Sequence, residues 1–315
     1  MHMLIDGNNL AHRVFHTPQG SLTTKDGTPS GVLLGVLNSI KGLLEKFPNT
    51  ETITVMWDGG RSEWRKKLYP GYKAQRDYGK DDEEKAEAYQ GLWDQINELD
   101  KVLELISVDS VKITGFEADD LIALMTKKRE ERDEEVLVVT SDKDMLQLVS
   151  EKTSVYSPYK DVVIGLSNFE DHTGVKLEAY MGYRALVGDS SDNILGVPGI
   201  GEKTAQNLMK KYGHIDNILG ATGAVKKELM KSKRNARIFE PENLNRLGVN
   251  NRIMNFKYIP EDSKVDEMLT LMCEVEPEPV NVKQFKAWLM KWQFVSILSN
   301  FLAWISPFSI LGSEE

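Results

Sequence analysis

Apolar runs that end in an acidic residue recur in the first half of the chain. They are Met3–Asp6, Ile53–Asp58 and Val136–Asp142, with a weaker apolar run at Val111–Thr114. Segments of helical composition lie between them. Continuous apolar strands that alternate with helices are typical of a parallel sheet covered by helices on both faces. The pattern therefore predicts an α/β domain built on such a sheet.

Two further segments predict helices outside that alternation. Between Lys80 and Leu105 the chain has helical composition with an acidic start, and it is too long for an ordinary connection between strands. It is either an elaborated, mobile element or a solvated surface helix with an amphipathic continuation. From about Tyr180 to Ile259, glycine, lysine and arginine become frequent, which predicts a second, mainly helical module.

The stretch from Trp288 to Leu311 is rich in Trp, Phe, Leu and Ile. A membrane span needs roughly 20 consecutive apolar residues. Polar residues and Pro307 interrupt this run, so we expect helices that pack on the protein core, and no membrane partner.

Composition narrows the class of protein. Of the 315 residues, 41% are hydrophobic and 28% are charged, which is ordinary for a globular protein. Cys273 is the only cysteine, so an intrachain disulfide and a multi-cysteine zinc site are excluded. An acidic strand end follows the N-terminus within a few residues and leaves no room for a signal peptide. We expect a cytoplasmic protein, with a monomer as the default state.

The net charge of −9 argues weakly against a nucleic-acid partner, because phosphate binders usually carry a basic face. Two segments nevertheless concentrate lysine and arginine, one from Arg61 to Arg76 and one from Lys203 to Arg237. Two basic surfaces on an acidic chain suggest that the acidic residues have another task, such as holding cations.

Acidic residues stand where the predicted strands end. Open α/β sheets bind ligands in the crevice beyond the carboxyl ends of their strands. Asp6, Asp58 and Asp142 are therefore expected to converge although they are far apart in sequence.

Three more groups of acids accompany them: Glu117, Asp119 and Asp120 in a first helical turn, Asp144 beside Asp142, and the pair Asp189 and Asp192. Acids in such places also serve as helix caps or solvated turn residues. Together, however, they form an oxygen-rich set of the kind that Mg²⁺ prefers. Two such cations roughly 3.5–4 Å apart activate water and stabilise a leaving oxygen. The set predicts a two-metal phosphodiesterase site.

The segment Trp57–Arg76 interleaves cations with aromatic residues. Cations and aromatics together suit a phosphate backbone and an unstacked base. Lys73 and Arg76 are placed to polarise a scissile phosphate or to stabilise charge in the transition state. A basic surface helix explains the same residues without a function.

The segment Gly196–Gly213 contains a tight glycine turn, Gly199-Ile200-Gly201, that opens a helix near Glu202. Glycines allow close backbone approach, and a helix N-terminus presents free N–H groups to a phosphate oxygen. This pattern indicates a helix–hairpin–helix element that grips duplex backbone without reading sequence. A glycine cap between two packed helices is the alternative.

In order along the chain, the strings GTPSGVLLG, WDGG, YPGYKAQR, FEADDLIA, TSDKDMLQLV and GDSSDNILGVPGIGEKTA closely resemble the 5′-nuclease superfamily. That family comprises phage flap endonucleases, phage ribonuclease H and the 5′-nuclease domain of bacterial DNA polymerase I. The resemblance implies a PIN-like α/β nuclease domain (residues 1–180) with a helical arch at about 71–105. It also implies a helix–three-turn–helix duplex-binding module (181–259), followed by a C-terminal helical extension (260–315).

The resemblance also implies roles for individual residues. The first metal site would comprise Asp6, Asp58, Glu117, Asp119 and Asp120, and the second Asp142, Asp144, Asp189 and Asp192, with Asp142 or Asp120 shared. Both sites would take Mg²⁺, for which Mn²⁺ substitutes, and the turn Val197–Gly201 would hold K⁺. Lys73 and Arg76 would be catalytic cations with Asp142, and Tyr72 would stack on a terminal base. The expected DNA contacts are Arg65, Lys66, Tyr72, Gly199, Gly201, Lys203, Lys210 and Lys211.

The predicted activity is therefore an Mg²⁺-dependent 5′→3′ exonuclease and flap endonuclease of replication or repair. Its substrates would be DNA flaps, nicks and ends, or RNA·DNA primers in a ribonuclease H reaction, with a single-stranded-DNA-binding protein as partner. A PIN-type ribonuclease and a non-catalytic junction-binding protein are the alternatives. Two features depart from the family pattern: Leu195 stands where proline is frequent, and the arch segment is acidic. No polymerase domain follows in the sequence, which favours a stand-alone phage or accessory nuclease.

Overall fold

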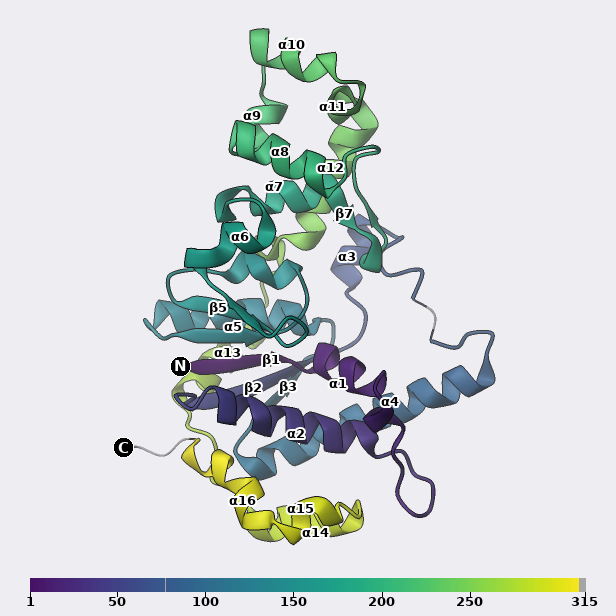
Figure 1. The fold of residues 1–315 in the computed structure, drawn as a ribbon, viewed down its shortest axis with the longest axis vertical. Helices are drawn as coiled ribbons and strands as arrows, with labels where there is room; N and C mark the ends of the chain where they lie inside the picture. The colour runs from purple at the N-terminus through teal and green to yellow at the C-terminus, as the bar shows by residue number, and fades with distance from the viewer. Residues whose placement is uncertain (77, 312–315) are drawn as a thin grey trace.

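The computed structural model describes residues 1–76 and 78–311 and is built on a six-stranded sheet (Figure 1). The strand order is β3-β2-β1-β4-β5-β6, in which the first five strands run parallel and β6 is antiparallel to β5. The strands are β1 (His2–Asp6), β2 (Thr52–Trp57), β3 (Asp109–Lys112), β4 (Val136–Val139), β5 (Thr153–Ser157) and β6 (Val162–Ile164).

Alternate residues of each strand enter two separate cores because successive side chains point to opposite faces of a sheet. Leu4 packs into one core, whereas Met3 and Ile5 pack into the other. On β4, Val138 shares the core of Leu4, and Val139 shares the core of Ile5. The centre of the sheet is buried on both faces, which is why Met3–Ile5 of β1 and the whole of β4 are continuously apolar in sequence.

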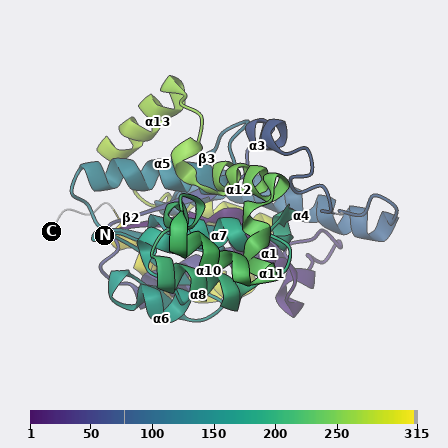
Figure 2. The same cartoon turned by 90° about the horizontal axis from the view of Figure 1, so that it is seen from above.

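Helices cover both faces. The core of Ile5 is closed by α1 (Gly7–Phe15), α2 (Gly31–Lys46), α4 (Glu83–Val102), α14 (Val282–Lys291), α15 (Val295–Ser299) and α16 (Phe301–Ile305). The core of Leu4 is closed by α5 (Ala118–Glu131), α6 (Phe169–Thr173), α7 (Leu177–Val187), α12 (Pro241–Met254) and α13 (Ser263–Glu274). Figure 2 shows α13 lying beside α5, its main packing partner.

A helical module extends from one end of the sheet (Figure 1). It comprises α7 to α12, with α8 (Glu202–Tyr212), α9 (Ile215–Leu219), α10 (Gly223–Lys231), α11 (Lys233–Ala236) and the small hairpin β7 (Gly188–Asp189) and β8 (Ile194–Leu195). The short helix α3 (Glu63–Leu68) packs against α12.

The predicted fold class, a parallel sheet between helical layers with a helical module, is confirmed. Details differ from the sequence prediction: β3 begins at Asp109 and β4 ends at Val139, before Asp142. Strands β5 and β6 were not predicted, because β5 carries polar residues that are also typical of turns, and β6 is only three residues long.

The predicted arch segment contains the twenty-residue helix α4. Asp82 caps its N-terminus by accepting a hydrogen bond from the Lys85 amide at 3.0 Å. The C-terminal half packs into the core through Leu92, Ile96 and Leu99, whereas the N-terminal half projects from the body of the protein (Figure 1). The same helix thus combines a buried base with an exposed, acidic tip.

The apolar C-terminal segment packs on the core, as the sequence predicted. Phe285 and Phe308 are fully buried, and the Trp304 indole donates to the Asn38 side chain at 2.9 Å. Glu98 of α4 accepts hydrogen bonds from two further indoles, those of Trp288 and Trp292. Among the residues described, no helix is both long and apolar enough to cross a membrane.

Replacing Phe285 with alanine should lower the free energy of unfolding by about 3–5 kcal/mol, because a fully buried aromatic ring leaves a cavity. The matched control is Leu302→Ala on the same segment, where the side chain is 79% exposed. Its effect should stay within about 0.5 kcal/mol. Urea unfolding measures both, and equal effects would show that the segment is not docked.

Candidate nucleic-acid cleavage site

Strand β1 and helix α1 meet at Asp6, which ends the strand and caps the helix. Its carboxylate accepts hydrogen bonds from the Asn9 amide at 2.9 Å and the Thr140 hydroxyl at 3.0 Å. Asp58, just after β2, accepts a bond from the Ala118 amide at the N-terminus of α5 at 2.9 Å. Both acids therefore lie at the positive end of a helix, which stabilises their charge.

The acids that end the strands face one cavity, as the parallel topology predicts. A cavity of about 330 Å³ is lined by Asp6, Asp58, Asp119 and Asp142. Lys73 and Arg76 line it too and supply the opposite charge. Acids from β1, β2, α5 and the end of β4 are thus brought together.

Glu117 and Asp120 are tied to a buried arginine. Asp120 accepts two bonds from the Arg65 guanidinium at 2.7 and 2.9 Å, and Glu117 accepts one at 2.9 Å. The Asp120 side chain also bonds the Glu117 amide, closing a capping box on α5. Asp120, an expected metal ligand, is wholly buried behind Glu117 with both carboxylate oxygens engaged by Arg65.

The prediction that Arg65 contacts DNA is wrong. The residue is 1% exposed, and its Nε donates to the Ile253 carbonyl of α12 at 3.1 Å. The guanidinium donates to four protein partners, Ile253, Ser62, Glu117 and Asp120, and offers no surface to a phosphate backbone. Sequence spacing placed Arg65 among exposed cations, but the side chain points inward.

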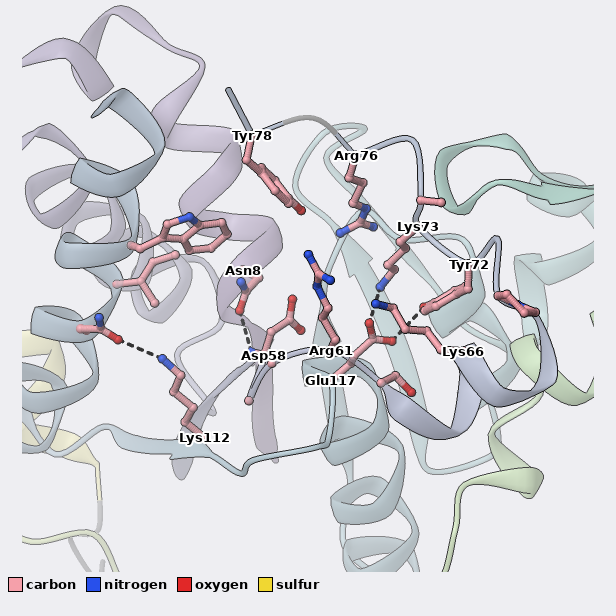
Figure 3. A pocket seen from close by; sticks show the side chains of 18 residues that line it. Asn8, Asp58, Arg61, Lys66, Tyr72, Lys73, Arg76, Tyr78, Lys112 and Glu117 are labelled. Carbon is pink, nitrogen blue, oxygen red and sulfur yellow. Dashed lines mark hydrogen bonds and ion pairs between the residues drawn. The ribbon is translucent and has the colours of Figure 1, made fainter. Parts of the chain in front are cut away.

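Tyr72 and Lys73 join the same network (Figure 3). The Tyr72 hydroxyl donates to Glu117 at 2.8 Å, and the Lys73 ammonium donates to the other oxygen of Glu117 at 2.8 Å. Tyr72 is only 3% exposed, so in this structure its ring does not offer the open stacking face that the sequence predicted. Lys73 has a positive φ of 53°, in the left-handed region, and its side chain lines the cavity.

The second group of acids is arranged around Arg184. This guanidinium donates to Asp144 at 2.8 Å and to Asp189 at 2.7 Å. Asp192 accepts instead from Arg76 at 2.7 Å. Asp142 and Asp144 lie in the turn that follows β4. The strand has ended, and the Asp144 amide turns back to the Asp142 carboxylate at 2.7 Å.

A larger cavity of about 720 Å³ adjoins the acidic one and shares Asp58, Lys73 and Arg76 with it (Figure 3). Its wall is basic and aromatic, formed by residues that include Arg61, Lys66, Tyr72, Lys73, Arg76, Tyr78, Trp93 and Lys112. Lys66, an expected DNA contact, does face this cavity. The combination can accommodate phosphates beside unstacked bases.

Several contributors were missed from the sequence. Asn8 accepts a bond from the Asp58 amide, and Asn9 accepts one from the Ser141 amide, so both fix loops that carry acids. The polar run Gly7–Asn9 directly after Asp6 was the available signal. Arg184 was also missed, although an arginine within the apolar helix α7 just before Asp189 is unusual.

Burial raises the pKa values of several acids of the site. Burial, with added repulsion from Asp58 and Asp119, raises the pKa of Asp6 from 3.8 to about 7. Burial and the charge of Asp119 likewise raise the pKa of Glu117 to about 7, although Lys73 and Arg65 oppose the shift. Burial raises the pKa of Asp144 to about 6 against the effect of Arg184. The folded protein thus holds acids that a cation would stabilise in their charged form.

The donor set fits hard divalent cations. Carboxylate oxygens of Glu117, Asp119 and Asp120 lie within 4.8 Å of one another. Asp6, Asp58 and Asp142 line the neighbouring cavity. Oxygen ligands in such number suit Mg²⁺ or Mn²⁺.

The glycine turn of the helical module lies on the surface. Gly199 has a φ of +83°, a conformation that favours glycine, and Gly201 precedes the first turn of α8. Lys203, Lys210 and Lys211 of α8 are exposed. Arg237 donates to the Pro198 carbonyl at 3.3 Å and brings a further positive charge to the turn.

Two protein-family models together match residues 1–257 of this chain. Residues 1–174 match the model of the 5′-3′ exonuclease N-terminal resolvase-like domain. Residues 175–257 match the model of the 5′-3′ exonuclease C-terminal SAM fold.

Individual relatives agree. A 5′-3′ exonuclease of Buchnera aphidicola (subsp. Schizaphis graminum) is 32% identical over 75% of this chain and 79% of its own length. The thermostable DNA polymerase I of Thermus thermophilus is 34% identical over 75% of this chain but only 27% of its own length.

Among solved structures, the T5 D15 protein co-crystallised with metal ions is similar. It has a TM-score of 0.72 at 22% identity, covering 87% of this chain and 98% of that chain. At this identity the likeness concerns the fold.

The raised acid pKa values predict how stability depends on pH. An acid with a higher pKa in the folded state binds more protons there, so stability falls as pH rises. For Asp6 and Glu117 this loss runs from about pH 4 to about pH 7, and a divalent cation should reverse it. Mg²⁺ added at about 100 times its dissociation constant should raise the Tm by roughly 5 °C at pH 8. At pH 5 the rise should be much smaller. An equal rise at both values, measured by differential scanning fluorimetry, would contradict the prediction.

Proposed function

Because this chain belongs to the 5′-3′ exonuclease family of nucleases, we propose that it is an Mg²⁺-dependent 5′ nuclease that cuts DNA at flaps, nicks and ends. The family membership agrees with the resemblance seen in the sequence. The observation that carries the proposal is a cavity lined by four acids from distant strands and helices and by the side chains of Lys73 and Arg76.

The acids fall into two groups that suit two cations. Asp6, Asp58, Glu117 and Asp119 would hold the first, with Asp120 fixing Glu117 from behind. Asp142, Asp144, Asp189 and Asp192 would hold the second. Bound divalent cations supply an activated water and stabilise charge on the departing oxygen. Structural neighbours of this chain include a T5 D15 flap endonuclease in complex with DNA and metal ions.

Lys73 and Arg76 are proposed to act on the phosphate. Each now neutralises an acid, Glu117 for Lys73 and Asp192 for Arg76, at 2.8 and 2.7 Å. Both also line the large basic cavity, so a phosphate placed there lies within reach of both side chains. Their role would be to orient the phosphate and to offset negative charge that grows in the transition state.

The helical module is proposed to hold duplex DNA through its exposed glycine turn and the lysines of α8. The turn Val197–Gly201 is the proposed K⁺ site, supported by its glycine conformation. The arch helix α4 and the aromatic wall of Tyr78, Tyr89 and Trp93 would border the free 5′ strand.

The primary test is cleavage of 5′-labelled substrates with Mg²⁺ and with EDTA. A DNA flap, a nicked duplex, a matched RNA flap and an RNA·DNA hybrid separate the possible substrates. We expect Mg²⁺-dependent cutting near the junction of the DNA flap. Binding without cutting in every condition would favour a junction-binding protein, and preference for the RNA flap would favour a PIN-type ribonuclease.

Asp119→Ala and Asp142→Ala should each lower the cleavage rate on the order of a thousandfold, since each removes an oxygen ligand from the cavity. DNA binding, measured by fluorescence anisotropy, should persist. The control is Asp171→Ala, an exposed acid of α6, which should cut at the normal rate. Full activity in either cavity variant would refute the site.

A further inference from the structure

Arg184 occupies the centre of the second group of acids. Its Nε donates to an Asp144 oxygen at 2.8 Å, and its Nη2 donates to Asp189 at 2.7 Å and to the same Asp144 oxygen. The residue is 4% exposed. A buried arginine held by two carboxylates keeps its charge at any physiological pH.

Helix α7 fixes this group at two further points. The Tyr180 hydroxyl, one turn before Arg184, donates to the Lys143 carbonyl at 2.7 Å. The helix then ends at Gly188 and leads directly into Asp189. One helix therefore positions the Asp142–Asp144 loop and also supplies the next acid.

The two groups of acids are neutralised differently. In the first group, Arg65 binds Asp120 and Glu117, and Lys73 also binds Glu117, while Asp6, Asp58 and Asp119 line the cavity. In the second, Arg184 takes Asp144 and Asp189, and Arg76 takes Asp192. Three of the four carboxylates of the second group are thus paired with protein cations, and two positive charges balance half of its formal negative charge.

We propose that Arg184 is a positioning residue whose fixed positive charge sets the affinity of the second acid group for a divalent cation. The inference rests on the proposed function, because it takes that group as a cation site. Arg184 holds Asp144 and Asp189 in place and at the same time repels the incoming cation. Removing its charge should therefore tighten cation binding at this group.

The test is an EPR titration of DNA-free protein with Mn²⁺ at pH 8. Arg184→Gln keeps a hydrogen-bond donor without the charge. It should bind Mn²⁺ about tenfold more tightly than the wild type at one class of site, because it lacks the Coulomb repulsion between one unit charge and a divalent cation in a solvated site. Arg184→Lys, which restores the charge, should stay within about twofold of the wild type.

The matched control is Arg129→Gln. Arg129, near the C-terminus of α5, is equally buried, at 3% exposure. It pairs with Glu134 in the loop that follows this helix, away from both acid groups. It should leave Mn²⁺ affinity unchanged. To assign the tighter site, Arg184→Gln is combined with a second substitution. Its gain in Mn²⁺ affinity should persist in the double variant with Asp119→Asn and disappear in the double variant with Asp192→Asn.

Unchanged or weaker Mn²⁺ binding by folded Arg184→Gln would overturn the inference. Should that variant fail to fold, Arg184→Leu carries the same expectation, and unchanged affinity there has the same meaning. A wild-type protein that binds no Mn²⁺ would instead refute the cation site of the proposed function.

Discussion

Repulsion between carboxylates is the constraint around which this protein is organised. Acids from four parts of the chain are gathered at one edge of a buried sheet, where burial, together with repulsion from neighbouring acids, raises the pKa of Asp6 and Glu117 to about 7. The fold makes this tolerable with helix N-termini, with Lys73 and Arg76, and with two buried arginines. Arg65 and Arg184 each bridge two acids, so each arginine offsets negative charge in one of the two acid groups.

These bridges also connect the layers of the molecule. Arg65 lies on α3, binds the acids of α5 and donates to a carbonyl of α12 in the helical module. Arg184 joins α7 to the loop after β4. The Lys73 amide bonds the Asp192 carbonyl, and the Gln75 side chain bonds the neighbouring Ser190 and Ser191 carbonyls. These hydrogen bonds connect the base of the arch segment to the second acid group, so the charge balance of the site and its shape are set by the same contacts.

The sequence predicted the sheet and the meeting of Asp6, Asp58 and Asp142, because strand-end position follows from apolar patterning and parallel topology. It did not predict which charged side chains turn inward. Arg65 and Lys66 are neighbours in one basic helix, yet the first is buried beneath Asp120 and the second lines the open cavity. That difference depends on contacts with α5 and α12, which are remote in sequence. Arg184 was overlooked for the same reason, since its partners lie forty residues upstream as well as next to it.

The packing of the C-terminal helices has a consequence for how the chain folds during synthesis. The core behind Ile5 is built from the first part of the chain and is closed by Phe285, Trp304 and Phe308. A ribosome adds about 5–20 residues each second, so the apolar face of α2 and α4 stays exposed for many seconds until the C-terminal helices have been synthesised. The opposite core receives α5, α7 and α12 earlier. The two faces of one sheet are thus completed at different times, and the face that waits is the one a nascent-chain chaperone would have to protect.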